Sequence, residues 1–347
     1  MIYFNLASLS AWLIERHYSQ ILLLVDTNTQ RDCYPILASY LGDIPHQVLT
    51  IAAGERHKNI DTCATIWQAM LRNELDRKAV LVNLGGGVIG DMGGFCASTY
   101  KRGIDFVQIP TSLLGQTDAS IGGKLGVDFE GLKNVIGVFQ NPTSTWIDTC
   151  FLATLPLDEL RSGLAEVMKH GLIASVAYWQ RLPDFFSPQA MDWQYVVAES
   201  IEIKKNIVAL DFKENDIRKV LNFGHTIGHA LESFSLLKAK QQNTKALLHG
   251  EAVAIGMMAE AFLSVKYASL PQKDFEAIVR KISNYFHDIS LVEYDFVEVA
   301  KLALQDKKNQ RGHILCTLLS KIGTAVCNQV ITEKDVVEAL EAIGFKS

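Results

Sequence analysis

The chain has 347 residues, 48% of them apolar and 20% charged, which is typical of a globular protein with two domains. Its 33 Lys and Arg against 38 Asp and Glu give a net charge of −5, which argues against binding to the phosphate backbone of nucleic acids. The many aromatic residues exclude a disordered chain, and no apolar run is long enough for a transmembrane helix.

The amino-terminal segment predicts a short strand followed by an amphipathic helix, and it lacks the basic start of a signal peptide. Short apolar runs then predict buried strands at 21–25, 47–51, 79–84 and 104–109, with helices at 60–72 and 93–100. Continuous apolar strands separated by helices indicate a parallel sheet covered on both faces. The first part of the chain is therefore predicted to be a Rossmann-like α/β domain.

After Asp148 the pattern becomes mainly helical, with long helices predicted at 192–210 and 250–266. We therefore expect an α/β domain over residues 1–150 and a mainly α-helical domain over residues 151–347, with a boundary uncertain by about ten residues. The six cysteines are scattered and form no C-x-x-C motif, which indicates reduced thiols and a cytoplasmic location.

A glycine-rich turn, residues 85–91, follows the strand predicted at 79–84 and matches the pattern G-x-G-x-x-G. Backbone N–H groups in such a turn can bind a pyrophosphate, although a lone match can also be only a tight turn. The next strand ends in Pro110, where a dinucleotide-binding domain usually has an acidic residue for the ribose. A dinucleotide would therefore bind here in a variant mode.

Two lysines stand in glycine-rich sequence beyond this turn. Lys124 follows two glycines, and Lys133 precedes Asn134. A single lysine is usually a solvated surface charge, but two of them beside exposed backbone donors favour phosphate binding.

Three further segments predict a metal site. His225 and His229 are spaced to share one face of a helix, His249 opens the helix predicted at 250–266, and Glu166 lies upstream. Glu166, His225 and His249 could bind a catalytic zinc ion with an open position for water or substrate. The alternative is that each histidine is an interior residue with its own hydrogen-bond partners.

Motifs in chain order resemble those of the 3-dehydroquinate synthase family, and the match extends from about residue 26 to 308. The matching segments are 85–91, 110–114, 118–124, 133–134, 165–169, 221–229 and 249–254. The resemblance implies a lyase of the shikimate pathway, in aromatic amino acid biosynthesis, that uses NAD⁺ and a divalent metal, Zn²⁺ or Co²⁺. Its reaction converts 3-deoxy-D-arabino-heptulosonate 7-phosphate into 3-dehydroquinate and phosphate by transient oxidation, β-elimination, re-reduction and aldol closure.

The resemblance also implies roles for individual residues. The metal ligands would be Glu166, His225 and His249. The NAD⁺ contacts would be Asp26, Gly54, Glu55, Lys58, Gly87, Val88, Ile89, Gly90, Asp91, Thr111, Ser112, Lys124, Lys133, Phe151, Leu152, Ala153 and Thr154. The catalytic and substrate contacts would be Arg102, Asp118, Lys124, Asn134, Lys169, Lys204, Arg218, Asn222, His229 and either Lys307 or Lys308, with Lys307 as the first choice. Arg102 would reach into a neighbouring subunit, which implies a homodimer.

Three alternatives remain at this point. A metal-dependent polyol dehydrogenase, such as glycerol dehydrogenase, shares the domain pattern and the paired histidines, but it does not need so many basic residues. A cyclase that makes an inosose or a valiolone takes a substrate without the carboxylate that Lys204 and Arg218 would bind. A non-catalytic protein of the same fold is disfavoured by the complete set of metal-binding and glycine-rich motifs.

Overall fold

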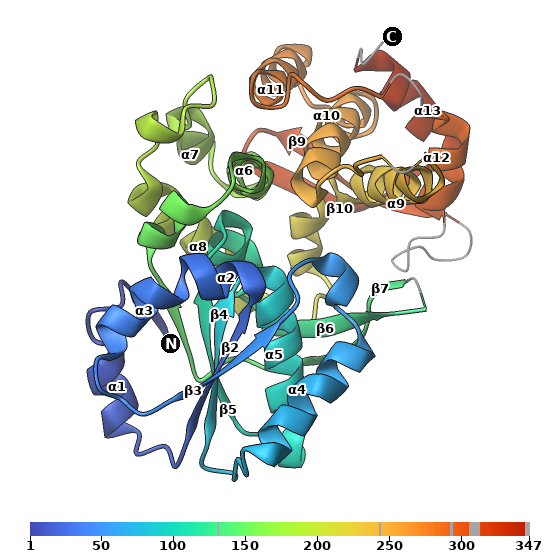
Figure 1. Ribbon diagram of the computed structural model, residues 1–347. Helices are drawn as coiled ribbons and strands as arrows, with labels where there is room; N and C mark the ends of the chain where they lie inside the picture. Colours follow the sequence, from blue (N-terminus) through green and yellow to red (C-terminus); the bar gives the residue numbers. More distant parts are fainter. Residues whose placement is uncertain (131, 243, 292–293, 305–312, 344–347) are drawn as a thin grey trace. The chain divides into compact units, whose positions relative to one another are not determined.

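The computed structural model describes residues 1–130, 132–242, 244–291, 294–304 and 313–343 (Figure 1). The chain divides into two compact units, Met1–Leu160 and Arg161–Ser347. Each unit is considered separately below.

The first unit is an α/β domain. Its helices and strands are β1 (Ile2–Phe4), α1 (Leu9–Glu15), β2 (Ile21–Asp26), α2 (Thr27–Asp32), α3 (Tyr34–Leu41), β3 (Gln47–Ile51), α4 (Ile60–Arg72), β4 (Val80–Gly85), α5 (Gly87–Thr99), β5 (Asp105–Pro110), β6 (Lys124–Phe129), β7 (Leu132–Phe139) and β8 (Ser144–Ile147). Short helical turns occur at Glu55–His57, Tyr100–Arg102, Gly115–Ala119 and Thr149–Thr154.

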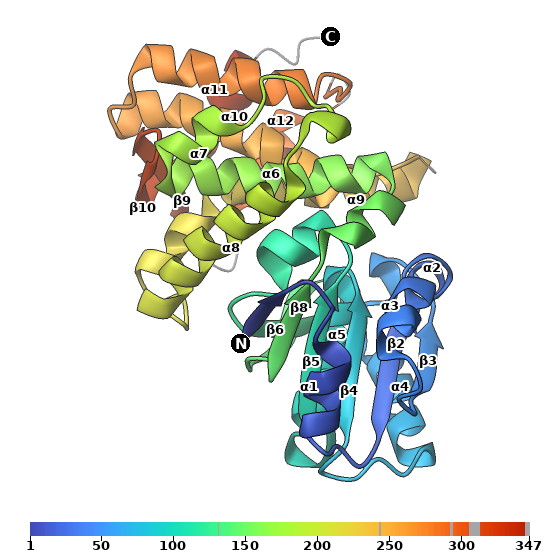
Figure 2. The ribbon, with the colours of Figure 1, turned by 90° about the vertical axis from the view of Figure 1, so that its left-hand side faces the viewer.

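Six strands form one sheet in the order β1-β8-β5-β4-β2-β3, and all the pairs are parallel (Figure 2). β6 and β7 form a separate antiparallel hairpin. The chain runs outward from β2 to β3 and then returns to the other side of β2 with β4. This reversal is a topological switch point, where parallel sheets bind ligands at the carboxyl ends of the strands.

Alternating side chains of β2 fill two cores, one on each face of the sheet. Leu22 and Leu24 pack with side chains of α4 and α5, whereas Leu23 and Val25 pack with side chains of α1 and α3. The period of two residues in a strand requires this division. The predicted parallel sheet with helices on both faces is thus confirmed.

The helix expected at 93–100 begins earlier, at Gly87, within the glycine-rich turn. Its interior glycines are required by packing: a Cβ on Gly93 would lie 1.9 Å from Oδ1 of Asn83, and one on Gly94 would lie 2.5 Å from Cδ2 of Leu125. Close contact between the helix and its neighbours outweighs the low helix propensity of glycine here. Propensity alone therefore placed the helix start too late.

The second unit is mainly helical. Its elements are α6 (Leu157–Ala174, which begins in the first unit), α7 (Val176–Arg181), α8 (Trp193–Leu210), α9 (His225–Gln242), α10 (His249–Tyr267), α11 (Gln272–Tyr285), α12 (Phe296–Leu304), β9 (Ile314–Lys321), β10 (Thr324–Ile331) and α13 (Glu333–Ala342). Short helical turns occur at Pro188–Ala190 and Ile217–Asn222. The helices expected at 192–210 and 250–266 are present with these slightly different ends.

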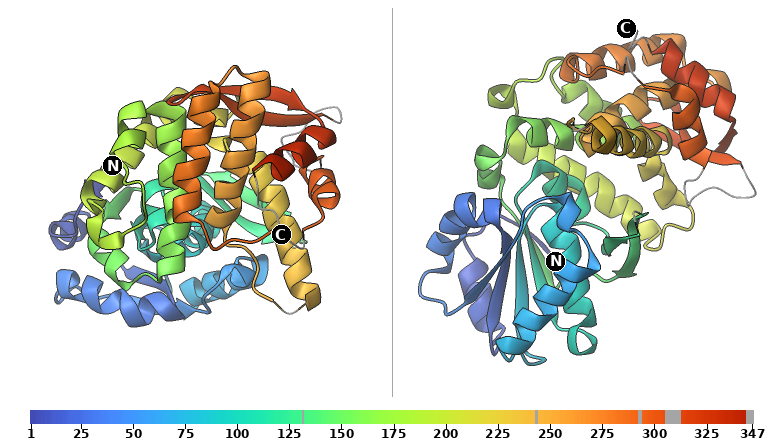
Figure 3. Two further views of the ribbon diagram at one scale, coloured as in Figure 1. Left: turned by 90° about the horizontal axis from the view of Figure 1, so that it is seen from above. Right: turned by 45° about the vertical axis from the view of Figure 1, so that its right-hand side comes forward.

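α10 is the central helix of this unit and packs against α9, α11, α13 and β9 (Figure 3). Most of its side chains are buried, from Gly250 to Ser264, as its nearly apolar sequence predicts. The antiparallel pair β9–β10 was not anticipated from the sequence. Among the described residues, no helix is both long enough and apolar enough to cross a membrane.

Candidate active site

Glycines bring three helices of the second unit into close contact. A Cβ on Gly256 of α10 would lie 2.0 Å from the carbonyl oxygen of Gly224, just before α9, and one on Gly250 would lie 1.9 Å from that of Ser162 in α6. Only glycine permits the backbones to approach this closely. The first turns of α9 and α10 are thereby held beside α6.

This packing brings the predicted metal ligands together. Nε2 of His225 lies 3.3 Å from Oε1 of Glu166, and Nε2 of His249 lies 3.8 Å from the same oxygen. Ligand atoms around a tetrahedral zinc ion are about 3.4 Å apart. One carboxylate and two imidazoles at this spacing fit a Zn²⁺ or Co²⁺ ion, and three protein ligands leave a coordination position open.

Both imidazoles have an acceptor close to the nitrogen that faces away from Glu166. Nδ1 of His225 lies 3.1 Å from the carbonyl oxygen of Phe223, and Nδ1 of His249 lies 3.4 Å from Oε2 of Glu232. Acceptors at these positions favour the tautomer with hydrogen on Nδ1, which leaves Nε2 available to a metal.

The local charges favour metal binding as well. Burial raises the pKa of Glu166, but the charge of Lys169, together with His225 and His249, outweighs burial and holds this pKa well below its usual value. Burial, together with Lys169, lowers the pKa of His225 to about 3. At neutral pH Glu166 is therefore a carboxylate and His225 is neutral, as ligands must be. Burial lowers the pKa of His249, but hydrogen bonds with Glu166 and Glu232 raise it to about 9, so this ring must lose a proton when a metal binds.

Two of the predicted substrate residues lie beside this cluster. Lys169, which is buried, forms an ion pair with Glu166 one turn away on α6. The ring of His229 lies 5.2 Å from that of His225 and 5.9 Å from that of His249, measured between ring centroids. The structure thus brings Lys169 and His229 to the three predicted metal ligands.

Other predicted residues lie on neighbouring elements of the same unit. Lys204 of α8 and Arg218 of the turn Ile217–Asn222 are both buried, and these two elements pack together. Arg218 donates from Nη1 to the carbonyl oxygen of Phe212 at 2.5 Å, and Asn222 donates to Glu214 at 2.8 Å. Lys307 and Lys308 lie outside the described residues.

In the first unit the glycine-rich turn lines a hollow at the carboxyl end of β4. The walls of this hollow include Gly85, Gly87, Gly90 and Ser120. A Cβ on Gly85 would lie 2.6 Å from Cβ of Ile89, so packing requires this glycine. A Cβ on Gly87 would make only an ordinary contact of 3.4 Å with Ala119. Gly87 is therefore not needed for packing, and its small size keeps the hollow open.

An ion-pair network holds the surroundings of this turn. Nζ of Lys58 lies 2.6 Å from Oδ2 of Asp91, and Lys58 is buried. Burial lowers the pKa of Lys58, but the charges of Asp91, Glu55 and Asp128 outweigh burial and raise it. Nζ of Lys133 lies 3.9 Å from Oε1 of Glu55. The structure thus brings four of the predicted NAD⁺ contacts together.

The remaining predicted residues of this unit lie at or near the carboxyl ends of the strands. Asp26 ends β2 and caps α2, accepting hydrogen bonds from the backbone of Asn28 and Thr29. Thr111 donates from its backbone to Gly85 at 3.0 Å. Gly54 follows β3, Ser112 follows β5, and Ala153 and Thr154 follow β8. Phe151 and Leu152 are buried.

Four predicted substrate residues also belong to the first unit. Asp118 lies in the turn Gly115–Ala119, Lys124 begins β6, and Asn134 lies on β7. Arg102 is exposed and has a positive φ of 69°. These four residues therefore lie on four different elements of the first unit.

Two residues of the site were missed by sequence reasoning. Glu232 contacts His249, as described above, and Gln108 donates from Nε2 to the carbonyl oxygen of Gly90 at 2.9 Å. Neither belongs to a recognisable motif, so only the folded chain reveals them.

A parallel sheet with a glycine-rich turn, together with a helical unit that carries a Glu-His-His cluster, defines a class of enzymes that use a nicotinamide cofactor and a divalent metal. The comparisons with known proteins refine this class. A family model described as 3-dehydroquinate synthase N-terminal matches residues 48–162, and one described as 3-dehydroquinate synthase C-terminal matches residues 163–309. The chain belongs to the 3-dehydroquinate synthase family, as its motifs predicted.

A curated relative agrees with this assignment, and two solved structures share the fold. A 3-dehydroquinate synthase of Parabacteroides distasonis is 39% identical over 96% of this chain and 94% of its own. The structure of a 2-epi-5-epi-valiolone synthase from Streptomyces hygroscopicus, with NAD⁺ and Zn²⁺ bound, has a TM-score of 0.83 at 27% identity, over 99% of this chain and 96% of that one. A 2-deoxy-scyllo-inosose synthase, complexed with carbaglucose-6-phosphate, NAD⁺ and Co²⁺, has a TM-score of 0.85 at 22% identity, over 98% and 96%.

Proposed function

We propose that this chain converts 3-deoxy-D-arabino-heptulosonate 7-phosphate into 3-dehydroquinate and phosphate, as a carbon–oxygen lyase of the cytoplasm. The observation that carries the proposal is the cluster of Glu166, His225 and His249, with Lys169 paired to Glu166, in a chain of the 3-dehydroquinate synthase family.

Glu166, His225 and His249 would hold the metal, and the residues around the glycine-rich turn would hold NAD⁺. When bound, the metal polarises a substrate hydroxyl, and NAD⁺ accepts a hydride and returns it. Gly87 and Gly90 leave room for the pyrophosphate, and the first backbone N–H groups of α5 donate to it. The ion pair of Lys58 and Asp91 fixes the segment that carries Glu55 beside the same turn.

Buried basic residues would bind the two anionic groups of the substrate. Lys204 and Arg218 are assigned to the carboxylate, because a planar guanidinium can donate two parallel hydrogen bonds to it. Lys124 and Asn134 are assigned to polar groups of the sugar acid, as are Asp118 and Asn222. His229 lies beside the proposed metal ligands, where an imidazole would transfer a proton to or from the bound substrate. The substrate's own phosphate can then accept the proton that is lost in β-elimination.

We further propose that the chain forms a homodimer in which Arg102 approaches the partner subunit. Exposed apolar side chains of the hairpin β6–β7 support such an interface, because a cluster of this kind is unfavourable in water. They are Phe129, Leu132, Val135 and Phe139.

The metal assignment has a direct test in His225→Ala. Loss of one ligand of three should weaken zinc binding more than about 100-fold. This effect is larger than that of losing a residue that only hydrogen-bonds to a ligand. Metal analysis and phosphate release from the heptulosonate phosphate, with NAD⁺ added, would both fall to background. The exposed His287 supplies the matched control, since His287→Ala should change neither quantity. Full zinc occupancy in His225→Ala would remove this residue from the site.

A polyol dehydrogenase is the second candidate. The helical unit and paired histidines favour it, but its uncharged substrate gives no role to Lys204 and Arg218. Net production of NADH from glycerol would support it, and its absence would support the synthase.

A further inference from the structure

Glu232 is a buried carboxylate that the sequence motifs do not include. It lies on α9, one turn beyond His229, and its side chain is 7% exposed. A buried carboxylate is unfavourable unless a charged or hydrogen-bonding group compensates for it. One group that it faces indicates a role for it.

That group is the second imidazole of the metal cluster. Oε2 of Glu232 lies 3.4 Å from Nδ1 of His249, while Nε2 of the same ring faces Glu166. Each of the two ring nitrogens of His249 thus faces a carboxylate. His225 has a neutral carbonyl group, that of Phe223, at the corresponding position. The two histidine ligands therefore differ in the charge of the group behind them.

We propose that Glu232 is a positioning residue for the metal centre, which accepts a hydrogen bond from Nδ1 of His249 and so aims Nε2 at the metal. A carboxylate in this place fixes the tautomer and the orientation of the ring, and it makes the imidazole a stronger donor. This inference rests on the proposed metal site of Glu166, His225 and His249.

A direct ligand role for Glu232 is the competing possibility. His229, Glu232 and His249 also have ligand atoms within 4.8 Å of one another. In that arrangement Glu166 and His225 would not be needed for metal binding, whereas His229 would be. The two possibilities therefore predict different sets of essential residues.

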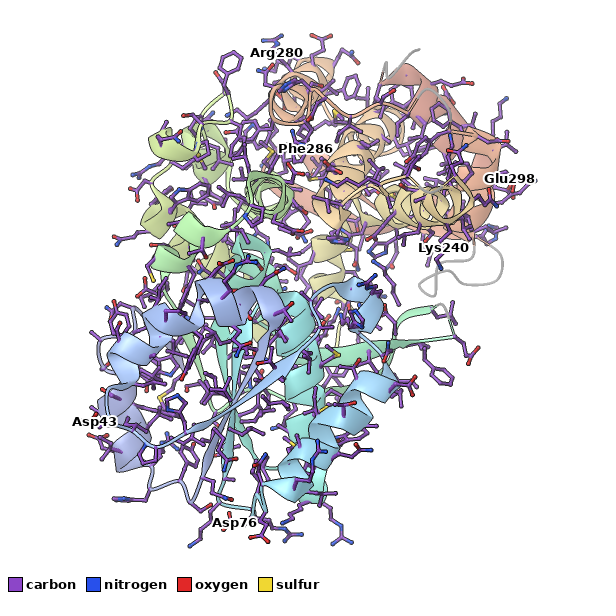
Figure 4. The ribbon with its side chains drawn as sticks, viewed as in Figure 1. Asp43, Asp76, Lys240, Arg280, Phe286 and Glu298 are labelled. Atoms are coloured by element: carbon purple, nitrogen blue, oxygen red, sulfur yellow. The ribbon has the colours of Figure 1, made fainter. Side chains whose placement is uncertain are left out.

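The test measures metal affinity and needs no turnover. The full chain is stripped of metal with a chelator, and Zn²⁺ is titrated in competition with a chromophoric chelator. Glu232→Ala should bind one Zn²⁺ with about 10–100-fold lower affinity, and Glu232→Gln should lose less, because its amide oxygen still accepts a hydrogen bond. Glu298→Gln is the charge-matched control, since Glu298 is 52% exposed and lies on the outside of α12 (Figure 4).

Each outcome has a definite meaning. Affinities in both Glu232 variants equal to that of Glu298→Gln would overturn the inference. Loss of zinc in His229→Ala but not in Glu166→Gln would also overturn it, by making Glu232 a direct ligand. Failure of the unaltered chain to bind one Zn²⁺ would instead contradict the proposed function. Circular dichroism of the metal-free variants checks folding, and Glu232→Gln carries the test if Glu232→Ala does not fold.

Discussion

Glu166 keeps a negative charge inside the second unit because cationic and imidazole groups surround it. Burial alone would raise its pKa, but Lys169 and His225 together hold the pKa well below its usual value. His249 shows the opposite balance, since burial lowers its pKa while hydrogen bonds with Glu166 and Glu232 raise it to about 9. The cluster therefore carries charges that a divalent cation can replace.

Gly87 allows the space for NAD⁺ to be tested separately from folding. Gly87→Ala adds a methyl group that meets only Ala119 at 3.4 Å, so stability should change by less than about 0.5 kcal/mol. The same methyl group would enter the space assigned to the pyrophosphate. Crowding of this kind costs about 1–3 kcal/mol, or ~5–150-fold in NAD⁺ affinity.

Calorimetric titration of NAD⁺ and thermal unfolding measure these two effects. Gly85→Ala is the contrasting variant, because its methyl group would collide with Ile89 and should lower the melting temperature. Unchanged NAD⁺ affinity in Gly87→Ala would place the cofactor elsewhere.

Arg218 tests the assignment of the substrate carboxylate. Arg218→Lys keeps the charge but loses the planar donor pair and the bond to the carbonyl oxygen of Phe212. A lost charge-assisted hydrogen bond costs ~1.5–3 kcal/mol, so kcat/KM should fall by about 10–150-fold. Steady-state kinetics with the heptulosonate phosphate measure this change, and the exposed Arg280 provides Arg280→Lys as a control (Figure 4). An unaltered kcat/KM would show that the carboxylate binds elsewhere.

For single residues, the sequence predicts the candidate metal ligands better than the side chains that hold those ligands in position. His225, His229 and His249 predicted a metal site by their residue type and spacing, because histidines one helical turn apart are typical of such sites. Glu232 could not be found in the same way, since its contact with His249 depends on how α9 packs against α10. Gln108 and Gly90 are likewise joined only by the sheet and its neighbouring helix.

At the scale of elements, close helix packing builds the metal site. A Cβ on Gly228 of α9 would lie 3.0 Å from the carbonyl oxygen of Ala252, so α9 and α10 approach through their small residues. The approach places His225 and His249, each the first residue of its helix, beside one another. Side chains at helix starts are held by rigid elements and so keep their geometry.

The start of α13 makes a prediction about stability and pH. Asp335 accepts hydrogen bonds from Nζ of Lys266 at 2.9 Å and from the hydroxyl groups of Tyr267 at 2.6 Å and Thr332 at 2.7 Å. Burial raises the pKa of Asp335, but these bonds outweigh burial and hold it well below its usual value. The unfolded chain therefore binds this proton at higher pH than the folded chain does. The stabilisation is complete above about pH 4 and is lost as pH falls through the folded-state pKa.

Asp335→Asn should accordingly lower the free energy of unfolding at neutral pH by about 1–3 kcal/mol. Urea denaturation at neutral pH and at about pH 3 measures the difference, which should shrink in acid. Asp43→Asn serves as the control, because Asp43 is exposed (Figure 4). Equal destabilisation at both pH values would show that the ionised carboxylate is not responsible.

The elements themselves were predictable where the pattern was local. The run 21–25 is apolar throughout, as a buried parallel strand must be, and it became β2. The run 47–51, which includes Gln47 and Thr50, became the half-buried edge strand β3. β9 and β10 were missed although Gly323, with a φ of 85°, marks the turn between them. β10 mixes polar and apolar residues that are mostly partly exposed, whereas β9 is mostly buried, so neither strand shows a strict alternation. The strand pattern of β9 and β10 is weak, and the surrounding sequence is mainly helical, so the two strands were not predicted.

At the scale of the whole molecule, the two units carry different parts of the chemistry. The first unit has the glycine-rich hollow at the carboxyl ends of its parallel strands, and the second has the Glu-His-His cluster. A polyol dehydrogenase needs the same two features. What separates the synthase from it is whether the hydride returns to the product in each cycle.

The most direct test of this account follows phosphate and NADH together. The chain is supplied with zinc, the heptulosonate phosphate and NAD⁺ at a concentration well below that of the substrate, and absorbance is followed at about 340 nm. Phosphate should exceed the total NAD⁺ many times over while the absorbance stays nearly constant, because each turnover regenerates NAD⁺. Formation of NADH in amounts equal to the product would contradict the account and identify a dehydrogenase.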